Sequence, residues 1–398
     1  MSREVVYVFY VSPTFLIFLS LNLYSSLCFI LVLFFISLAF QWTDIDMYDG
    51  DPLKENPRVG YGVPGVSRGA VPIQRMYGVT GDGHSVCCHI HGFTPYFWTV
   101  PPADMTEKDI PAWQQALEAQ LAGSRAKSRI DVAIPQVQLV PEKQSLLGYH
   151  FNRKQNMLKV YTTMPNIVPT AKGVLERGLH VPGLGTKSYL CFEANVPFSL
   201  RFMIDSKIVG CNWCEAPAGT YALRPMNKRV TTAQIEIDIV YDSLISHEPE
   251  GVWQRIAPLR ILSFDIECMG RKGYFPEAEH DPVIQIANVV TQQGSSKSIV
   301  RNVFTFGSCS PIVGAGVHSY TTEQEMLAQW SKFVVEADPD IITGYNVQNF
   351  DLPYLLNRMK ALKVDDAFIL GRIRGVKATM KDTTFQSSAY GKMENVET

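Results

Sequence analysis

The hydrophobic and polar positions of this chain follow a different pattern in each of three successive stretches, and the first stretch is uniformly apolar. No charged residue occurs from Val5 to Thr43, and residues 15–40 are almost all hydrophobic. This run exceeds the roughly 20 residues that span a bilayer. A helix that is apolar all round belongs in lipid or in a large core. The pattern therefore predicts an apolar helix over residues 15–40 that does not pack into the globular body.

Short β-type runs dominate the second stretch. Residues 44–72 are rich in glycine, proline and charge, which predicts an extended linker after a hydrophobic segment over residues 1–43. The strand-like runs that follow are residues 71–79, 85–93, 134–140, 157–164, 188–196, 200–205 and 231–241. One helical pattern, residues 109–123, interrupts them. Together they predict a β-rich domain over residues 73–250.

The third stretch alternates strand and helix periods. Its strand-like segments are residues 259–267, 281–292, 297–307 and 340–346, and its amphipathic segments are residues 321–340 and 350–362. Short connections between the first three strands predict an antiparallel meander. Thr322 and Glu325 have the spacing of a helix capping box. The order predicts a ribonuclease-H-like layer over residues 251–398, so the fold class of the chain is α+β.

Composition narrows the class of protein. The chain has 398 residues, a net charge of −2 and eight cysteines without regular disulfide spacing. These values exclude a globally basic nucleic-acid binder and suit a reducing compartment. Cys211 and Cys214 form one C-x-x-C, which supplies too few ligands for a structural zinc site. In a strand Cys87, His89 and His91 would line one face, and we favour core packing over metal binding there.

Two carboxylates close the first strand of the third stretch. Asp265 and Glu267 lie two residues apart, so a strand places both on the same face as Ser263. Like charges side by side repel, and burial raises the cost. A divalent cation such as Mg²⁺ or Mn²⁺ would resolve the repulsion, because hard cations bind carboxylate oxygens. The alternative is a strand end that opens into solvent with both acids hydrated.

A third carboxylate begins the last amphipathic helix. Asp351 stands where the positive end of the helix dipole favours a negative charge. As an alternative it is simply a helix cap, a common role for aspartate at this position. In a ribonuclease-H-like topology the first strand and this helix meet. We therefore expect Asp265, Glu267 and Asp351 to converge closely enough to share a metal ion.

Several long segments, in the right order, carry a family resemblance. The sequences FDIEC at residues 264–268 and YNVQNFDLPYLLNR at residues 345–358 resemble the first two exonuclease motifs of family B DNA polymerases. The segments SVCCHIHGFTPYFW, LRFMIDSKIVGCNW and PLRILSFDIECMGRKGYFPEAEHDPVIQIAN resemble the N-terminal and exonuclease regions of the eukaryotic replicative branch. The resemblance runs from about Gln41 to the end of the chain.

This resemblance implies nuclear DNA replication and 3′→5′ proofreading by a two-metal exonuclease. Carried over by position, Asp265, Glu267 and Asp351 correspond to the catalytic, metal-binding acids for Mg²⁺ or Mn²⁺. Phe264 adjoins the first motif, and Asn346 and Phe350 belong to the second, so these three are candidate DNA contacts. The implied partners are single-stranded DNA, primer-template DNA and the accessory subunits of a replicative polymerase.

A local basic stretch agrees with DNA contact. Residues 352–381 hold seven basic side chains against two acidic ones. We take Arg358, Arg372, Arg374, Lys377 and Lys381 as candidate DNA-binding residues, because lysine and arginine near phosphates supply affinity without sequence preference. The alternative is an ordinary solvated helix and loop face.

Departures from the family pattern leave three functional hypotheses. The family's third exonuclease motif and its polymerase domain do not occur before Thr398, so the exonuclease domain reads as incomplete. The leading hypothesis is an N-terminal fragment of a replicative polymerase. The second is a DNA- or partner-binding fragment without catalysis, and we expect residues 41–398 to bind single-stranded DNA weakly without degrading it. The third, a membrane-anchored protein, rests on residues 15–40 alone; translated non-coding sequence is the preferred explanation of that segment.

Overall fold

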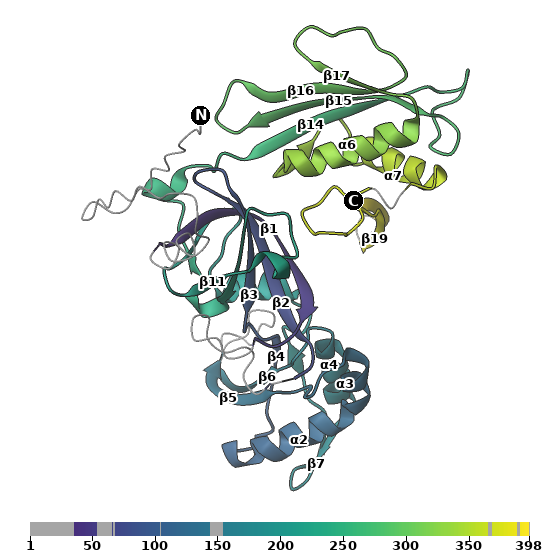
Figure 1. Cartoon of the computed structure of the whole chain (residues 1–398). Helices are drawn as coiled ribbons and strands as arrows, with labels where there is room; N and C mark the ends of the chain where they lie inside the picture. Colours follow the sequence, from purple (N-terminus) through teal and green to yellow (C-terminus); the bar gives the residue numbers. More distant parts are fainter. Residues whose placement is uncertain are drawn as a thin grey trace, which may run out of the picture.

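Three bodies follow one another along the molecule in the computed structural model (Figure 1). It describes residues 36–53, 66, 68–103, 105–143, 154–364, 368–387 and 391–397. A seven-stranded sheet forms the middle body, a four-stranded sheet with helices forms one end, and a five-stranded sheet with two helices forms the other. Each body has its own hydrophobic core.

The middle body is a curved, mostly antiparallel sheet in the order β11-β12-β3-β2-β1-β10-β13. Its strands are β1 Leu38–Gly50, β2 Val71–Thr80, β3 Ser85–His91, β10 Trp213–Ala216, β11 Tyr221–Leu223, β12 Ile235–Val240 and β13 Ile245–Ser246. Short 3-10 turns accompany it at η2 Met226–Lys228, η3 Tyr241–Ser243 and η4 Gly251–Gln254. The buried core includes Phe40, Met76 and Ile90, so apolar residues of three adjacent strands meet.

Strand β1 corrects two expectations from the sequence. Residues 38–40 are not part of an apolar helix, and residues 44–50 are not an extended linker. Leu38, Phe40 and Trp42 are buried, whereas the residues between them are partly exposed, and this period of two is that of a strand. Residues 1–35, the bulk of the predicted helix, lie outside the described residues. No helix of the described part has the length and apolar character needed to cross a membrane.

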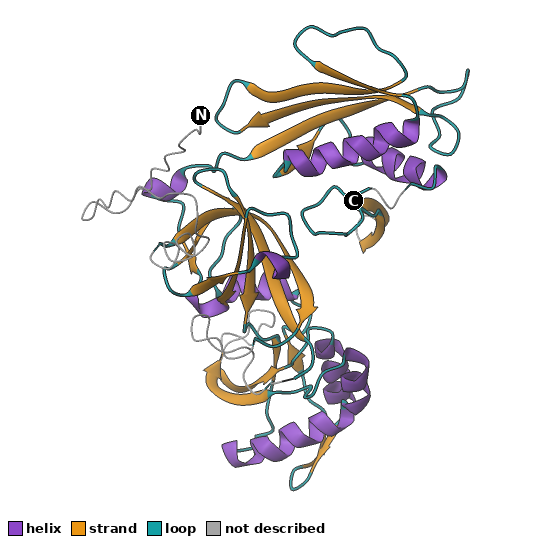
Figure 2. Cartoon of the chain, in the orientation of Figure 1, coloured by secondary structure: helices purple, strands orange, loops and turns teal. Residues whose placement is uncertain are grey.

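The second body is a four-stranded antiparallel sheet in the order β5-β6-β4-β9, with helices packed on one face. In chain order its elements are β4 Tyr96–Thr99, η1 Glu107–Asp109, α2 Ile110–Gln120, α3 Ala122–Ser128, β5 Gln136–Lys143, β6 Gln155–Tyr161, α4 Ile167–Arg177, β7 Leu179–Val181, β8 Gly185–Lys187 and β9 Cys191–Phe192. This is a β-α-β-β-α-β arrangement. Figure 2 shows its helices gathered on one side of the sheet.

Two segments of this region have a different structure from that predicted. The run over residues 200–205 belongs to helix α5 Phe198–Asp205 rather than to a strand. Phe198 and Phe202, four residues apart, both pack against Phe93, so the inward face follows helical rather than strand spacing. Helix α4 was not predicted either; Ile167, Ala171 and Val174 line its buried face with helical spacing.

The third body carries the predicted meander. Its sheet has the order β17-β16-β15-β14-β18, with β14, β15 and β16 antiparallel and β18 parallel to β14. Its elements are β14 Arg260–Cys268, β15 Val283–Gln292, β16 Ser298–Phe306, β17 Gly316–Tyr320, α6 Glu323–Ala337, β18 Ile341–Thr343, α7 Asp351–Ala361, β19 Lys381–Ser387 and β20 Gly391–Glu397. Edge strand β17 was not predicted. The Thr322 side chain accepts from the Glu325 N–H at 3.2 Å, so Thr322 caps α6 and one of the two hydrogen bonds of the predicted capping box is present.

The middle body and the third body are joined by hydrogen bonds between two loops. The Thr232 N–H donates to the Arg372 carbonyl at 2.8 Å, and the Arg374 N–H donates to the Val230 carbonyl at 2.9 Å. The Ser85 hydroxyl donates to the Asp338 carboxylate at 2.8 Å. The loop after α7 is thus fixed against the middle body rather than left free.

Candidate functional site

The two acids of strand β14 lie on the solvent face of the sheet, on the strand next to edge strand β18. Leu262, Phe264 and Ile266 are buried, whereas Asp265 and Glu267 between and beyond them are exposed. The buried residues pack into the core with α6 and α7, and this packing fixes the strand's orientation. The alternation predicted from the sequence is therefore present, and both carboxylates point away from the apolar core.

Helix α7 brings the third acid against the same strand. The Asp351 carboxylate accepts from the Ile266 N–H at 3.1 Å, and Ile266 lies between the other two acids. Asp351 is 1% exposed and is the first residue of α7, directly after the N-cap residue Phe350. Burial raises the pKa of Asp351, the Ile266 N–H lowers it, and the charge of Asp265 raises it further. The Asp351 carboxylate therefore ties the start of α7 to strand β14, which a helix cap alone would not do.

The turn before α7 depends on close backbone approach. A side chain at Gly344 would collide with the Phe264 carbonyl oxygen, so only glycine lets the end of β18 lie against β14. Asn346 follows with a left-handed φ of 57°, which asparagine tolerates. Its carbonyl accepts from the Asn349 and Phe350 N–H groups, and its side chain accepts from Asn349 Nδ2 at 3.0 Å. Asn346 therefore shapes the turn that delivers Asp351.

The chemistry of the three acids suits a hard divalent cation. Among the described residues, Asp265, Glu267 and Asp351 form no salt bridge, so no cationic side chain offsets their charge. Carboxylate oxygens are the ligands that Mg²⁺ and Mn²⁺ take. The three carboxylates do not, however, form a set of ligand atoms all within 4.8 Å of one another. The carboxylate oxygens are thus of the type that such an ion binds, but they lie farther apart than the ligands of a complete coordination shell.

Exposed aromatic side chains border the acids. Phe275, in the loop after β14, is 75% exposed, and Tyr345, in the turn before α7, is 91% exposed. Phe350 is partly buried and its ring meets those of Phe275 and Tyr354, each with centroids 5.6 Å apart. Exposed rings are platforms for unstacked bases. Sequence reasoning singled out Phe350 but missed Phe275 and Tyr345, whose only signal is their nearness in sequence to the acids.

Three of the residues predicted to contact DNA have structural roles instead. Phe264 is 3% exposed and packs against Trp330, with ring centroids 5.2 Å apart. Arg358 is buried, and its guanidinium donates to both Glu323 carboxylate oxygens at 2.8 and 2.7 Å. Arg372 pairs with Asp338 and Asp340 in a part-buried position. Counting basic residues in the sequence could not separate these residues from surface residues, because the count does not show whether a side chain is buried or paired.

The remaining basic candidates lie in the loop after α7. Arg374 is exposed, and among the described residues only its backbone N–H is engaged, by the Val230 carbonyl. Lys377 is exposed as well. Lys381 begins strand β19, and its side chain lies outside the described part of the structure. Arg374 and Lys377 thus remain candidate phosphate contacts on the surface.

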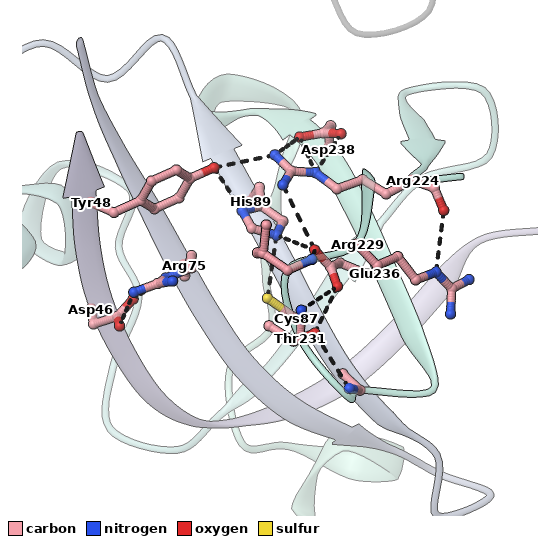
Figure 3. Close-up of polar contacts among 12 residues, drawn as sticks. Asp46, Tyr48, Arg75, Cys87, His89, Arg224, Arg229, Thr231, Glu236 and Asp238 are labelled. Carbon is pink, nitrogen blue, oxygen red and sulfur yellow. Dashed lines mark hydrogen bonds and ion pairs between the residues drawn. The ribbon is translucent and has the colours of Figure 1, made fainter. Parts of the chain in front are cut away.

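A second polar cluster lies in the middle body, where the sequence pattern favoured core packing (Figure 3). Cys87, His89 and Glu236 are fully buried, and their ligand atoms lie within 4.8 Å of one another. His89 Nε2 and the Glu236 carboxylate are 2.9 Å apart, a hydrogen-bond distance. Burial raises the pKa of Cys87 to about 12, so its thiol is protonated at neutral pH when no metal ion is bound.

Glu236 is saturated by donors on all sides. Its oxygens accept from the Val230 N–H at 3.0 Å, the Thr231 N–H at 3.1 Å and the Thr231 hydroxyl at 2.7 Å. Burial raises the pKa of Glu236, but the hydrogen bonds from His89, Val230 and Thr231 outweigh it and lower the pKa to about 2. The cluster is a buried hydrogen-bonded network that holds the 230–231 loop.

Comparisons with known proteins agree with the geometry. Residues 189–397 match the family described as DNA polymerase family B, exonuclease domain. Proteins named DNA polymerase delta catalytic subunit are similar over most of the chain: 47% identical in Oryza sativa and 45% in Mesocricetus auratus, each over 90% of this chain and 32% of the relative. The fission yeast Schizosaccharomyces pombe counterpart is 44% identical over 83% of this chain and 30% of its own length.

A solved structure shows the same fold. The family B DNA polymerase of Pyrobaculum calidifontis matches 87% of this chain and 35% of its own, with a TM-score of 0.52 and 24% identity. The chain spans about a third of the length of the curated relatives that it matches. The resemblance found in the sequence is thereby confirmed, together with the α+β class and the exonuclease fold.

Proposed function

Because the chain belongs to the family B DNA polymerases through its exonuclease domain, we propose that Asp265, Glu267 and Asp351 bind divalent metal ions and the 3′ end of a DNA single strand. The observation that carries the proposal is the buried Asp351 carboxylate, hydrogen-bonded to the Ile266 N–H between two exposed acids, with no cationic partner among the described residues. An uncompensated buried carboxylate is costly, and such costs concentrate at functional sites.

The proposed role of each group follows from its position. Mg²⁺ or Mn²⁺ held by the acids would lower the pKa of a bound water and stabilise the leaving 3′ oxygen. Asp351 is fixed by the Ile266 N–H and by the packing of α7, so it sets where the ligand oxygens meet. Phe275 and Tyr345 offer faces to unpaired bases, and Arg374 and Lys377 offer charge to phosphates.

By similarity to the named relatives, we also propose the wider setting. The chain would supply the N-terminal and exonuclease portion of a delta-type replicative polymerase. Its substrates would be single-stranded and primer-template DNA, its partners the accessory subunits of that enzyme, and its location the nucleus.

Metal binding by the full chain tests the site directly. Calorimetry with Mn²⁺ should show binding that Asp265→Asn and Asp351→Asn each weaken at least tenfold. The matched control is Glu279→Gln, which removes an exposed acid from the loop after β14. Unchanged Mn²⁺ affinity in both aspartate variants would overturn the metal-site proposal.

Binding without hydrolysis is the second candidate function. It is favoured by the wide arrangement of the three acids, which do not gather within 4.8 Å, because misplacement of about 1 Å already costs on the order of a hundredfold in rate. Digestion of a 5′-labelled single strand with Mn²⁺ separates the two. Loss of 3′ nucleotides that Asp265→Ala abolishes identifies an exonuclease, whereas salt-sensitive binding of an intact strand identifies a binding fragment.

A further inference from the structure

A cluster of four charged residues lies where the third body contacts the middle body, apart from the three acids of β14 and α7. Arg260 begins β14, Asp338 follows α6, Asp340 precedes β18, and Arg372 belongs to the loop after α7. The two arginines and the two aspartates balance in charge. The side chains of Arg372 and Asp340 are 13% and 5% exposed, so their charges depend on partners within the protein rather than on water.

Arg372 holds the two aspartates of this cluster together. Its guanidinium donates to Asp338 Oδ1 at 2.6 Å, to the Asp338 carbonyl at 3.3 Å and to Asp340 Oδ1. Asp338 has a left-handed φ of 46°, a conformation that aspartate tolerates. Without the guanidinium, two part-buried carboxylates two residues apart would repel each other. The segment that links α6 to β18 would then have to move.

Asp340 also fixes the start of β14. Its Oδ2 accepts from the Arg260 N–H at 2.7 Å, and its own N–H donates to the Arg260 carbonyl at 2.8 Å. The parallel ladder between β14 and β18 that begins here has three residue pairs, the first of which joins Ile261 to Ile341. Single backbone hydrogen bonds stabilise only modestly. The register of so short a ladder therefore depends on the contacts at its two ends.

The other end of this ladder leads to the acids. Beyond the ladder Gly344 lies against the Phe264 carbonyl, and the turn that follows brings the Asp351 carboxylate to the Ile266 N–H. Asp265 and Ile266 are neighbours on β14, so a shift of β18 along β14 would change where Asp351 lies relative to the acids of that strand. The position of the third acid thus depends on what holds β18.

The middle body holds Arg372 from the opposite side. The Thr232 N–H and hydroxyl donate to the Arg372 carbonyl at 2.8 and 3.3 Å. Ile373 packs against a small buried cluster of the middle body. Ser85, on β3, donates to the second carboxylate oxygen of Asp338 at 2.8 Å. Arg372 therefore lies between the middle body and the strand pair that leads to the acids.

We propose that Arg372 is a positioning residue for the metal-binding acids, because it joins the middle body to the segment that sets the place of Asp351. This role rests on the metal site proposed above and extends it, since contacts of the middle body become part of the site's geometry. The planar guanidinium of arginine donates to two carboxylates at once, whereas the ammonium of lysine is a point charge on a flexible stem. Arg372→Lys should therefore keep the charge of the cluster and only part of its geometry.

Calorimetry with Mn²⁺ on the full chain measures the effect on the metal site. Arg372→Met should weaken Mn²⁺ binding about tenfold and Arg372→Lys about threefold, because groups that orient metal ligands contribute on the order of tenfold or more to affinity. The matched control is Arg201→Met, which removes a buried arginine of α5 that pairs with Glu193 at 2.7 Å. It should lower stability and leave the Mn²⁺ affinity within twofold. Circular dichroism shows that each variant is folded.

Hydrogen exchange at the Ile266 amide reports the position of Asp351 without any metal. This N–H donates to the Asp351 carboxylate, so loss of that contact exposes it to solvent. In EDTA, Arg372→Met should speed its exchange about tenfold and Arg372→Lys about threefold, read by fragment-resolved mass spectrometry. The amides of β15 and β16 in the same sheet should change less than twofold. Arg201→Met should leave the exchange at Ile266 within twofold of the unmodified chain.

Three results would overturn the proposal. They are Ile266 exchange within twofold of the unmodified chain in both Arg372 variants, unchanged Mn²⁺ affinity in Arg372→Met, and an equal loss of affinity in Arg201→Met. If Arg372→Met does not fold, Arg372→Lys decides by the same readouts. If the unmodified chain binds no Mn²⁺, the metal-site proposal fails, and the exchange at Ile266 alone decides whether Arg372 positions Asp351.

Discussion

Two regions of this molecule contain clustered acids, and they differ in whether those acids have hydrogen-bond and ionic partners. In the middle body, Glu236 and Asp238 are surrounded by donors, with Arg224 donating to Asp238 at 2.7 Å and His89 meeting Glu236 at 2.9 Å. In the exonuclease body, Asp265, Glu267 and Asp351 meet one backbone N–H and no cationic side chain among the described residues.

The difference separates a structural use of charge from a functional one. Buried ionic groups persist when partners satisfy them, and removing one partner then costs stability. Acids left without partners repel one another, so they destabilise the fold until a ligand arrives. By this criterion the Glu236 network holds the fold together, and the β14–α7 acids are the ones that we propose bind a cation.

The largest expected effect is the loss of the Glu236 charge. Glu236→Gln should lower the free energy of unfolding by about 3 kcal/mol, because it leaves His89 and the 230–231 loop poorly paired in a buried site. Chemical denaturation measures this. The matched variant Asp265→Asn should change stability by no more than about 0.5 kcal/mol. Equal effects of the two substitutions would remove the contrast between the regions.

Two arginines show the same contrast between a charge with a partner and a charge without one: Arg358 is buried against Glu323, and the Arg374 side chain is exposed. Arg358→Met should lower the free energy of unfolding by about 3 kcal/mol, because it leaves the buried Glu323 carboxylate without its cationic partner. That carboxylate would keep only the hydrogen bond from the Val283 N–H. Arg374→Met should leave stability unchanged and reduce the salt dependence of single-strand binding by about one phosphate contact. Denaturation and anisotropy titrations over a salt series test the pair. If Arg374→Met unfolds the chain, its assignment to the surface fails.

Acid should destabilise the chain through the middle body. The pKa of Glu236 falls from its ordinary 4.5 to about 2 in the folded chain. Its contribution is therefore fully present above pH 4.5 and is lost as the pH falls toward 2, on the order of 2 kcal/mol. Unfolding midpoints measured from pH 6 to pH 2.5 should fall for the unmodified chain. They should fall less for Glu236→Gln, which carries no titrating group there.

The smallest effect has the opposite sign. Asp351→Asn should raise the free energy of unfolding by about 0.5–1 kcal/mol at neutral pH without metal, because it removes a buried charge with no cationic partner. Saturating Mn²⁺ should erase or reverse the gain by stabilising only the unmodified chain. Thermal unfolding with EDTA and with Mn²⁺ gives both numbers. Destabilisation by Asp351→Asn in EDTA would mean that the carboxylate is structural.

The sequence by itself determined strands β14, β15, β16 and β18 and helices α6 and α7 of the exonuclease body, but not edge strand β17, and it singled out the three acids. Period-two alternation placed Asp265 and Glu267 on one face of β14, and helical spacing placed Asp351 at the start of α7. These features are local, because backbone geometry alone fixes which residues share a face. The family motifs added the chemistry that this geometry permits.

Only the tertiary structure decided which charges are partnered. Arg358 and Arg374 look alike in sequence, yet one is buried against Glu323 and the other reaches solvent. The sequence predicted the end of an apolar helix and a linker over Leu38–Gly50. The structure has a strand there, because this segment pairs with β2 and β10. Cys87 and His89 meet Glu236 across 147 residues or more, through the pairing of β3 with β12. Such long-range contacts depend on strand pairing and packing, which no local pattern of residues records.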